Sequence, residues 1–354
     1  MLSRVDIENF RCIESATLEL SPRATGIVGS NGSGKTSVLE AIYFLGHGRS
    51  FRTSQRERLL RTGARDFRVV ARIAVAERTL VAGMEYAAGT TRVHLAGQPV
   101  SSLAEIAGIL PIQVIDPGVH RLIEEGSSRR RRLMDWGVFH VEPDFLRSWR
   151  RYQRALQQRN AALRALQGPA DVATWEGELI ASGEIVDRLR RTYVERLEPH
   201  FQRLAASMIG GQARFTYRRG WPGGVSLGDA YADARPRDLR LRTSSVGPHR
   251  ADLGFIVDDD SARDRVSRGQ QKMLASAFVL AQLSLRAAEG APPACLMLDD
   301  PAAELDVDNL GKLLRAVAEI PAQLIVTSVQ ERGLEGLAIE RMFHVKQGRF
   351  TPMV

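Results

Sequence analysis

The sequence is poor in cysteine, in lysine and in long apolar runs. Its 354 residues include two cysteines, Cys12 and Cys295, which lack metal-ligand spacing, so neither a disulfide framework nor a zinc site is expected. The apolar runs are far shorter than the roughly 20 residues that a membrane helix needs. The N-terminal "MLSRVDIENFRC" has no apolar signal core. These absences predict a cytoplasmic protein without a membrane partner.

Positive charge is concentrated in the middle third of the chain. Residues 121–250 hold 24 basic and 15 acidic residues, whereas residues 1–120 hold 14 and 11, and residues 251–354 hold 11 and 15. Such a local excess is typical of a surface that binds a polyanion. Only four of the 49 basic residues are lysine. A GC-rich genome produces that bias, but it does not explain the clustering. We therefore expect DNA or RNA contact here, with an ordinary solvated face as the alternative.

Hydrophobic periodicity predicts an α/β protein interrupted by helices. Alternating and continuous apolar segments indicate strands up to about residue 116, and a helix from Thr36 with an apolar face. From about residue 119 the pattern becomes helical and predicts two antiparallel helices. The α/β pattern then returns with the expected strands "LRLRT" and "ADLGFIV". The expected organisation is a head built from residues 1–118 and 240–354, and a basic, mainly helical arm or lid at 119–239.

The stretch "GSNGSGKTS" fits the Walker A phosphate-binding pattern and has the required context, an apolar strand before it and a helix after it. Its glycines let backbone N–H groups turn toward phosphates, and the helix N-terminus adds its positive end. Lys35 is expected to neutralise the β- and γ-phosphates of ATP or GTP, and Thr36 to ligate Mg²⁺. The predicted nucleotide-binding residues are Gly29, Ser30, Asn31, Gly32, Ser33, Gly34, Lys35, Thr36 and Ser37.

The segment "CLMLDD" (295–300) predicts a buried strand that ends in two carboxylates. Ligands of α/β sheets bind at the carboxyl ends of the strands. Asp299 is expected to hold Mg²⁺, as in a Walker B motif, and Asp300 to orient or activate the attacking water. The predicted catalytic residues are thus Lys35, Asp299 and Asp300. Capping of the next turn is the alternative for the acidic pair.

A third motif, "SRGQQK" (267–272), resembles the signature motif of ABC-type ATPases. Ser267, Gly269 and Gln270 match it, while Arg268 replaces the glycine common in transporters. A serine that caps a helix is common, so the hexapeptide alone is weak. Its value lies in its position upstream of "LMLDDPAAELD", which resembles a Walker B motif followed by a D-loop. Three motifs in this order favour an ABC-type ATPase.

Nearly the whole chain resembles the RecF family, bacterial recombination and repair proteins related to SMC-type ATPase heads. The resemblance is carried by "LSRVDIENFRCIESATLEL", "PIQVIDPGVHRLIEEGSSRRRRLMDWGVFHVEPDF", "SSVGPHRADL", "SRGQQK" and "LMLDDPAAELD". It implies an α/β fold, an ABC-type, SMC-like P-loop ATPase head with an inserted helical arm subdomain. It also implies slow hydrolysis, because Asp300 stands where many ABC ATPases have glutamate.

The resemblance further implies an ATP-dependent homodimer. Ser267 and Gly269 would contact the γ-phosphate of ATP bound to the other subunit. Thr327 would lie near that phosphate, and Gln113 is a weaker candidate for sensing Mg²⁺ and water. Binding at gaps and single/double-strand junctions, recombinase loading, and partnership with RecR and RecO follow from the family alone. His249 and Arg250 of "GPHR" are distinctive, but the sequence gives them no role.

Duplex DNA is the expected nucleic acid, bound through its backbone by arginines of the arm. The arginines have few aromatic residues among them, so the sequence shows no base-stacking platform. Some must form salt bridges instead, since four consecutive arginines on a helix point in all directions. The candidates are Arg129, Arg130, Arg131, Arg132, Arg150, Arg151 and Arg154. Alternative functions are the nucleotide-binding subunit of an ABC transporter, a kinase, and an ATP-bound scaffold.

Overall fold

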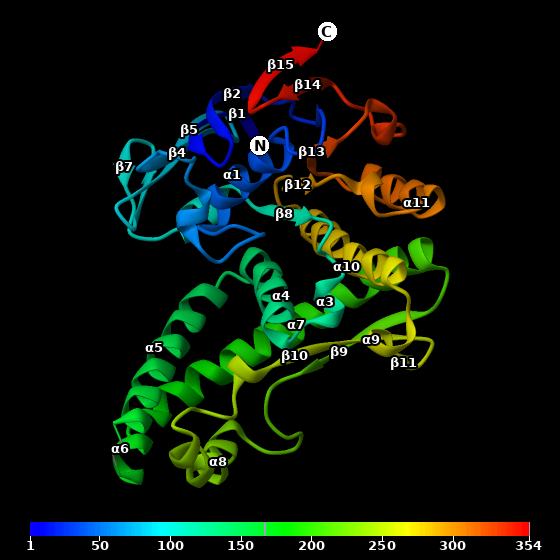
Figure 1. Ribbon diagram of the computed structural model, residues 1–354. Helices are drawn as coiled ribbons and strands as arrows, with labels where there is room; N and C mark the ends of the chain where they lie inside the picture. The colour runs from blue at the N-terminus through cyan, green and yellow to red at the C-terminus, as the bar shows by residue number, and fades with distance from the viewer. Residues whose placement is uncertain (166–167, 354) are drawn as a thin grey trace. The chain divides into compact units, whose positions relative to one another are not determined.

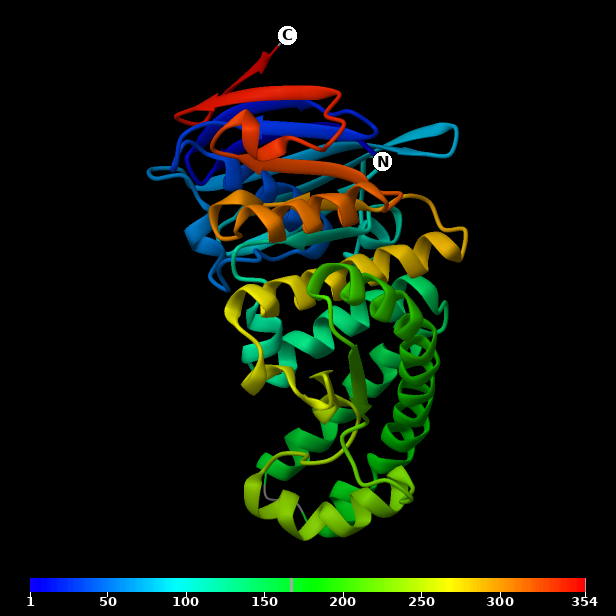
Figure 2. The same cartoon turned by 90° about the vertical axis from the view of Figure 1, so that its right-hand side faces the viewer.

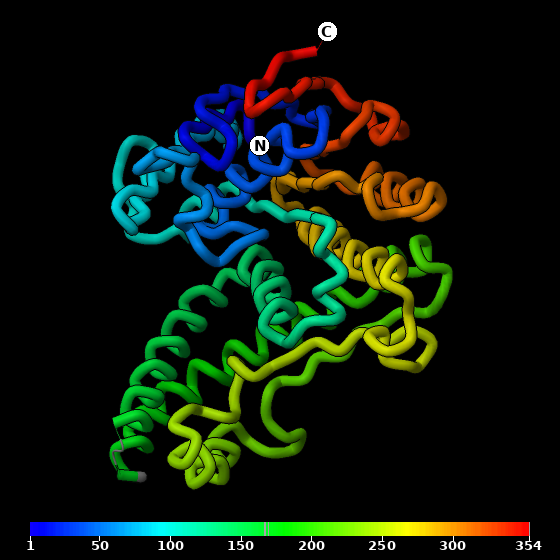
Figure 3. Tube along the Cα trace, in the orientation of Figure 1, coloured from blue at the N-terminus to red at the C-terminus, as the bar shows by residue number. Residues whose placement is uncertain are grey.

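Both ends of the chain lie in one folded unit, and the middle of the chain forms another. The computed structural model describes residues 1–165 and 168–353 (Figure 1). The first unit, here the sheet unit, contains Met1–His120 and Gly290–Val354, and both termini can be followed into it along the trace (Figure 3). The helical unit is the continuous segment Arg121–Glu289. Residues 240–289 thus pack with the helical residues. The division into head and arm at residues 118/119 and 239/240 stays a prediction.

The mainly parallel sheet of the sheet unit has the strand order β15-β14-β3-β13-β12-β8. All neighbours are parallel except β15, which pairs antiparallel with β14 at the edge. Every residue of β3 is buried, as in strands that are covered on both faces. The strands are β3 (Ala24–Val28), β8 (Ile112–Ile115), β12 (Cys295–Leu298), β13 (Gln323–Ser328), β14 (Arg341–Lys346) and β15 (Arg349–Met353).

A second, antiparallel sheet has the order β2-β1-β4-β5-β6-β7. Buried residues alternate with exposed ones along β4, so one face of the sheet is packed and the other is solvated. Helix α1 (Lys35–His47) packs against strands of both sheets. Its Phe44 meets Phe67 of β4 at a ring-centroid distance of 5.2 Å. The strands are β1 (Leu2–Phe10), β2 (Ile13–Glu19), β4 (Asp66–Val75), β5 (Arg78–Ala87), β6 (Thr90–Leu95) and β7 (Gln98–Pro99).

Short helices connect these strands. They are α2 (Ala104–Ile109), α11 (Val307–Ala318) and the 3-10 turns η1 (Arg56–Leu59), η3 (Pro301–Ala303) and η4 (Glu331–Leu334). Helix α11 begins where the Asp306 carboxylate accepts a hydrogen bond from the Asn309 N–H, a standard N-cap. A hairpin of β14 and β15 follows near the end of the described chain.

The helical unit is built around α7 (Glu176–Ile209), which packs against α5 (Phe145–Arg164) and α10 (Arg268–Ala288). Four phenylalanines from α7, α10, β9 and β10 join edge-to-face in its core, with ring centroids 5.1–6.3 Å apart. The other elements are α3 (Arg121–Glu124), α4 (Ser127–Val141), α6 (Pro169–Ala173), β9 (Ala213–Arg218), α8 (Leu227–Leu241), η2 (Pro248–Arg250), β10 (Asp252–Val257), β11 (Asp260–Ser261) and α9 (Ala262–Arg265). In the described part of the chain, no helix is long and apolar enough to cross a membrane.

Part of the basic excess of the middle third lies inside the helical unit. Arg159 is fully buried and forms ion pairs with Glu176 and Asp238. Arg190 is also fully buried and forms a two-pronged pair with Asp135. Buried guanidinium groups need such partners because desolvation of an unpaired charge is very costly. Net charge alone therefore overstates the number of arginines that are available to DNA.

The strand expected at "LRLRT" is wrong. Residues 239–241 are the last turn of α8, which lies with α6 at one end of the helical unit (Figure 1, Figure 2). The Ser226 hydroxyl caps the start of α8. Leu239 packs on a small cluster formed by Ala162, Leu163 and Val172. The two-residue alternation was too short to outweigh this helical packing.

Candidate nucleotide site

The phosphate-binding loop connects a buried strand to a helix, as its motif predicts. Strand β3 ends at Val28, and α1 begins at Lys35. Gly34 has φ = 119°, a conformation that side-chain-bearing residues rarely adopt. At Gly29, a Cβ atom would lie 2.4 Å from the Val345 carbonyl oxygen, because β14 passes close to the loop. The start of a helix leaves backbone N–H groups without an acceptor inside the helix, an arrangement suited to an anion.

The side chains of Lys35 and Thr36 form hydrogen bonds that fix them at the start of α1. The buried Lys35 Nζ donates hydrogen bonds to the carbonyl oxygens of Gly29 (2.7 Å) and Ser30 (3.1 Å), which keeps the ammonium group at the loop. Thr36 Oγ1 donates to Asp299 Oδ1 at 2.9 Å. This contact joins residues 263 positions apart in the sequence. The fold thus brings the predicted Walker A and Walker B residues together.

Asp299 and Asp300 follow β12 directly and have different environments. Burial raises the pKa of Asp299, while hydrogen bonds from Thr36 and Thr327 oppose the rise. Burial also raises the pKa of Asp300, and the charge of Lys35 opposes it. The Asp300 backbone is left-handed, at φ = 45° and ψ = 58°. Aspartate tolerates this region better than most residues do, so the backbone itself favours a short side chain at this position.

Thr327 links the Asp299 carboxylate to the Asp300 backbone. Its hydroxyl donates to Asp299 Oδ1 and accepts from the Asp300 N–H, both at 2.9 Å. The residue is fully buried on β13. The hydroxyl therefore fixes the left-handed peptide and the Walker B carboxylate at once. This geometry favours a positioning role for Thr327 over direct contact with a nucleotide.

The Thr327→Val variant tests whether Thr327 positions the catalytic carboxylates or only stabilises the fold. Removing the hydroxyl leaves the Asp300 N–H without its acceptor, while Asp299 Oδ1 keeps only the Thr36 hydroxyl as a donor. This change costs about 1–3 kcal/mol of unfolding free energy. ATP hydrolysis is expected to fall roughly tenfold to a hundredfold through misplacement of the carboxylates, with a smaller change in ATP affinity. Thermal unfolding, ATP titration and single-turnover hydrolysis measure the three quantities.

Thr25→Val is the matched control for this experiment. Thr25 is equally buried on the neighbouring strand β3, and its hydroxyl accepts a hydrogen bond from the Ser21 N–H. It should lose similar stability but keep its hydrolysis rate. Thr327→Ser, which retains the hydroxyl, should recover most of the rate. Equal rate losses in both valine variants would contradict the positioning role.

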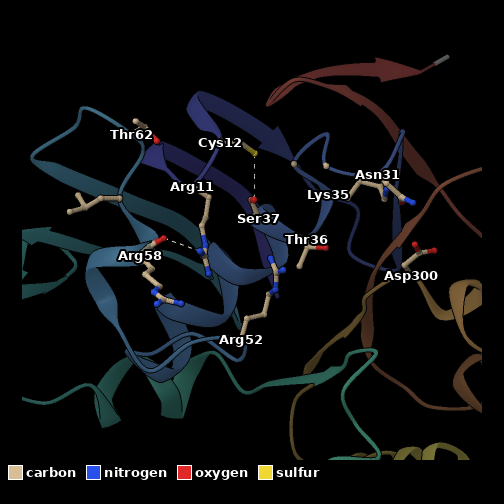
Figure 4. A pocket seen from close by; sticks show the side chains of 13 residues that line it. Arg11, Cys12, Asn31, Lys35, Thr36, Ser37, Arg52, Arg58, Thr62 and Asp300 are labelled. Carbon is tan, nitrogen blue, oxygen red and sulfur yellow. Dashed lines mark hydrogen bonds between the residues drawn. The ribbon is translucent and has the colours of Figure 1, made fainter.

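A cavity of about 530 Å³ opens beside the phosphate-binding loop, lined by Asn31, Gly32, Gly34, Lys35, Thr36, Ser37, Asp300 and residues that sequence reasoning missed. The missed residues are Arg11, Cys12, Arg52, Arg58, Leu60 and Thr62. In Figure 4 the side chains of Arg11, Arg52 and Arg58 lie across the cavity from Lys35 and Asp300. The Arg11 guanidinium is held by the buried Glu40 of α1 through two 2.8 Å hydrogen bonds. The charge of Arg52 favours ionised Asp299.

The donor set fits Mg²⁺ bound with a nucleotide. Thr36 and Asp299 offer a hydroxyl and a carboxylate oxygen in direct contact, and hard oxygen donors are what Mg²⁺ prefers. Mg²⁺ sites of this kind use only one or two protein groups and take the remaining ligands from phosphate and water. Gln113 lies buried on β8, next to β12. Its suggested role as a sensor stays a prediction.

The signature residues lie in the helical unit, at the start of α10. Ser267 Oγ accepts a hydrogen bond from the Gln270 N–H, and the Gln270 side chain accepts one from the Ser267 N–H. These two hydrogen bonds form a reciprocal capping box. Gly269, which has no side chain, lies between the two residues in the first turn of the helix. The exposed Arg268 reaches toward Glu124 at 3.6 Å. Contact of these residues with a nucleotide of a second subunit stays a prediction.

The predicted DNA-binding arginines differ in their availability. Arg130 is largely buried in a pair with Asp252, and Arg131 bonds the Ala251 carbonyl oxygen. Arg129 and Arg151 form exposed ion pairs with Glu125 and Glu178. The side chains of Arg132, Arg150 and Arg154 are exposed. DNA contact by any of the seven remains a prediction, but the geometry favours a structural role for Arg130 and Arg131.

Comparison with known proteins assigns the class of this fold. A family model described as "RecF/RecN/SMC N terminal domain" matches residues 1–351. A solved structure titled "Crystal structure of the SmcHead bound to the C-winged helix domain of ScpA" superposes with a TM-score of 0.63 at 18% identity, covering 99% of this chain and 96% of that one. The predicted fold class, an SMC-like ABC-type ATPase head, is confirmed.

Full-length relatives narrow the class to one family. The chain is 38% identical to "DNA replication and repair protein RecF" of Xanthomonas axonopodis pv. citri (strain 306), over 98% of this chain and 97% of the relative. It is 36% identical to the protein of the same name in Pseudomonas syringae pv. syringae (strain B728a), over 99% and 98%. "Structure of the recombination mediator protein RecF-ATP in RecFOR pathway" superposes with a TM-score of 0.89 at 23% identity, covering 100% and 97%. The chain belongs to the RecF family, and the ABC-transporter alternative is not favoured.

Proposed function

We propose that this protein is an ATP-dependent DNA-binding protein of recombinational repair. The observation that carries the proposal is the 2.9 Å contact between Thr36 and Asp299, which joins the phosphate-binding loop to the acidic strand. Lys35 balances the phosphate charge, and Asp300 orients the attacking water. Thr36 and Asp299 would hold Mg²⁺, and the ion would supply charge neutralisation at the phosphates. Hydrolysis is slow, because the short Asp300 side chain must reach the water.

ATP acts in this proposal as a switch for dimerisation. The signature residues Ser267 and Gly269 of one subunit contact the γ-phosphate of ATP bound to the other subunit. If the dimer binds ATP more tightly than the monomer does, ATP must favour association by the same free energy. Hydrolysis removes the bridging phosphate and releases the pair. The product is a timed clamp rather than a motor.

Duplex DNA is the proposed ligand of the dimer. Two copies of the basic middle segment double the number of phosphate contacts and make binding strongly salt-dependent. The exposed Arg132, Arg150 and Arg154 are the best candidates for these contacts. The family suggests action at gaps and single/double-strand junctions, recombinase loading, partnership with RecR and RecO, and a cytoplasmic location.

Oligomeric state and hydrolysis rate test this function together. Light scattering is measured with and without ATP, and the ATPase rate with and without duplex DNA. The expected result is a dimer with ATP only, and a low rate that DNA stimulates. A protein that stays monomeric with ATP, or whose rate is indifferent to DNA, would count against the proposal. Titrating salt adds a control, because DNA affinity should fall steeply with ionic strength.

A further inference from the structure

A second cavity, in the helical unit, has the side chains of a site for an anionic planar ligand. Its volume is about 640 Å³, and its lining includes Arg218, Arg219, Trp221 and Arg250. Binding pockets for small ligands typically enclose about 300–1,000 Å³. None of these residues belongs to the nucleotide site or to the predicted DNA-binding set.

The two loops that form the cavity wall are locked to each other. The Gly247 N–H donates to the Gly220 carbonyl oxygen at 3.1 Å. Gly220 has φ = 95°, and a Cβ atom there would lie 2.3 Å from the Gly247 carbonyl oxygen. Any side chain at residue 220 would therefore force the loops apart. The hydrogen bond and the close approach of the two loops therefore define the shape of this wall.

The "GPHR" segment, which the nucleotide site does not use, forms one side of this wall. The buried Arg190 donates to the Pro248 carbonyl oxygen at 2.6 Å. His249 Nε2 bonds the Ser244 carbonyl oxygen, so this nitrogen carries the proton, and Nδ1 accepts from the Tyr152 hydroxyl at 2.6 Å. Burial lowers the pKa of His249 to about 4, which keeps the ring neutral. The hydrogen bonds from Arg190 and Tyr152 thus hold Pro248 and His249 in place, and the next residue, Arg250, is exposed.

Positive charge at the cavity is not fully balanced. Asp252 is shared by Arg130 and Arg218. Arg219 and Arg250 bond only carbonyl oxygens, and among the described residues neither forms an ion pair. Burial and the charges of Arg190 and Arg250 lower the pKa of the nearby Arg131, while the carboxylates of Asp252 and Asp135 oppose this shift. Guanidinium groups crowded in this way favour a phosphate, which they can bind with two parallel hydrogen bonds.

An aromatic ring lies within this cationic group. The Arg219 guanidinium stacks over Trp221, 4.5 Å from the ring centroid, and the Trp221 indole N–H donates to the Val225 carbonyl oxygen. Nucleic-acid bases stack on both aromatic and guanidinium planes. A base within a duplex is already stacked on its neighbours and cannot enter a cavity of this size. An unpaired base can.

We propose that this cavity binds one nucleotide unit of an unpaired DNA strand, with its base on the Arg219–Trp221 pair and its phosphate against Arg218 and Arg250. The inference rests on the proposed function and deepens it. It supplies a single-strand contact that the duplex-binding arginines do not. Sequence reasoning missed it because Trp221 is remote in sequence from the arginine run at 129–132.

The test uses fluorescence anisotropy of a labelled oligo(dT) and of a labelled duplex, with full-length variants. Trp221→Ala is expected to weaken oligo(dT) binding by about 5- to 150-fold, the usual effect of losing one stacked base. Trp221→Phe should restore most of the affinity. Arg218→Gln and Arg250→Gln should each lower the salt dependence of oligo(dT) binding by about 0.7 in the log–log slope. Duplex binding and ATP-dependent dimerisation should change less than twofold.

Arg237→Gln is the control, since Arg237 is an exposed arginine of α8 outside the cavity lining. It should leave oligo(dT) binding within about twofold of wild type, as expected for a surface charge remote from the ligand. Arg218→Gln should fold as wild type does, because the Arg218 side chain is 71% exposed. Weaker binding in this variant would therefore not result from misfolding.

Unchanged oligo(dT) binding in Trp221→Ala and Arg218→Gln overturns the proposal. The proposal is also overturned if these variants lose binding to a poly-glutamate peptide but still bind oligo(dT) as wild type does. Failure of the proposed function is separate: it appears as wild-type protein that neither dimerises with ATP nor binds the duplex.

Discussion

Lys35→Ala is expected to abolish nucleotide binding at usable concentrations. The Lys35 ammonium is buried and held at the loop by two carbonyl oxygens. Its removal leaves the phosphate charge of ATP without its main counter-charge. Loss of one partner from a buried charge pair typically costs about 3–5 kcal/mol, which corresponds to an affinity loss of at least about 100-fold. Titration with a fluorescent ATP analogue measures the affinity directly.

Lys312→Ala is the matched control for this substitution. Lys312 lies half-exposed on α11, so the same change there should leave ATP affinity within about threefold. Thermal unfolding of both variants separates folding from binding, because ligand-free Lys35→Ala should unfold close to the wild-type temperature. A Lys35→Ala protein that binds ATP within threefold of wild type would refute the assignment of the loop.

Asp300→Asn is expected to trap an ATP-bound dimer. Asparagine tolerates the left-handed backbone at this position as well as aspartate does, so the substitution should preserve the fold. It removes the group proposed to orient or activate water, and loss of a general base typically lowers a rate by about 10²–10⁴-fold. ATP binding and dimerisation do not need this step. The variant should therefore dimerise with ATP and dissociate much more slowly than wild type, as followed by light scattering after dilution.

The pH dependence of hydrolysis adds a second readout for Asp300. Burial raises the pKa of this carboxyl, and Lys35 opposes the rise. Only the ionised form can accept a proton from water. The wild-type rate should consequently fall as pH decreases, and at a higher pH than for an exposed aspartate, while the residual rate of Asp300→Asn should not show this step. Asp66→Asn, at an exposed position in β4, is the control. An Asp300→Asn protein that cannot dimerise would overturn the roles assigned here.

The parts of the fold that the sequence predicted were those with local signals. The phosphate-binding loop, the acidic strand and the helix after "SRGQQK" each follow from residues close together in the chain, and each was found where expected. The limits of the folded units were harder to predict. Residues 240–289 resemble α/β sequence, yet they pack with the helical unit through long-range contacts that periodicity does not encode. The strand expected at 239–243 failed for the same reason.

The same limit applies to the candidate sites. Arg11 and Arg52 reach the cavity from segments before and after the motif, and no pattern in the sequence connects them to it. Contact of Thr327 with a nucleotide stays a prediction, and its burial and its hydrogen bonds to Asp299 and Asp300 favour a positioning role instead. Among the arginines predicted to bind DNA, the sequence could count positive charges but could not identify Arg130 and Arg151 as the partners of Asp252 and Glu178. Tertiary contacts decide which charges face solvent.

The arrangement of β3 has a consequence for protein synthesis. Both of its neighbours in the sheet, β13 and β14, come from the last part of the chain, after residue 322. A ribosome must therefore synthesise the chain as far as β13 and β14 before β3, which precedes the phosphate-binding loop, can pair. The continuous segment Arg121–Glu289 can fold earlier, as domains generally do during translation. A product terminated before β12 would consequently contain the basic segment but lack Asp299, Asp300 and both sheet neighbours of β3.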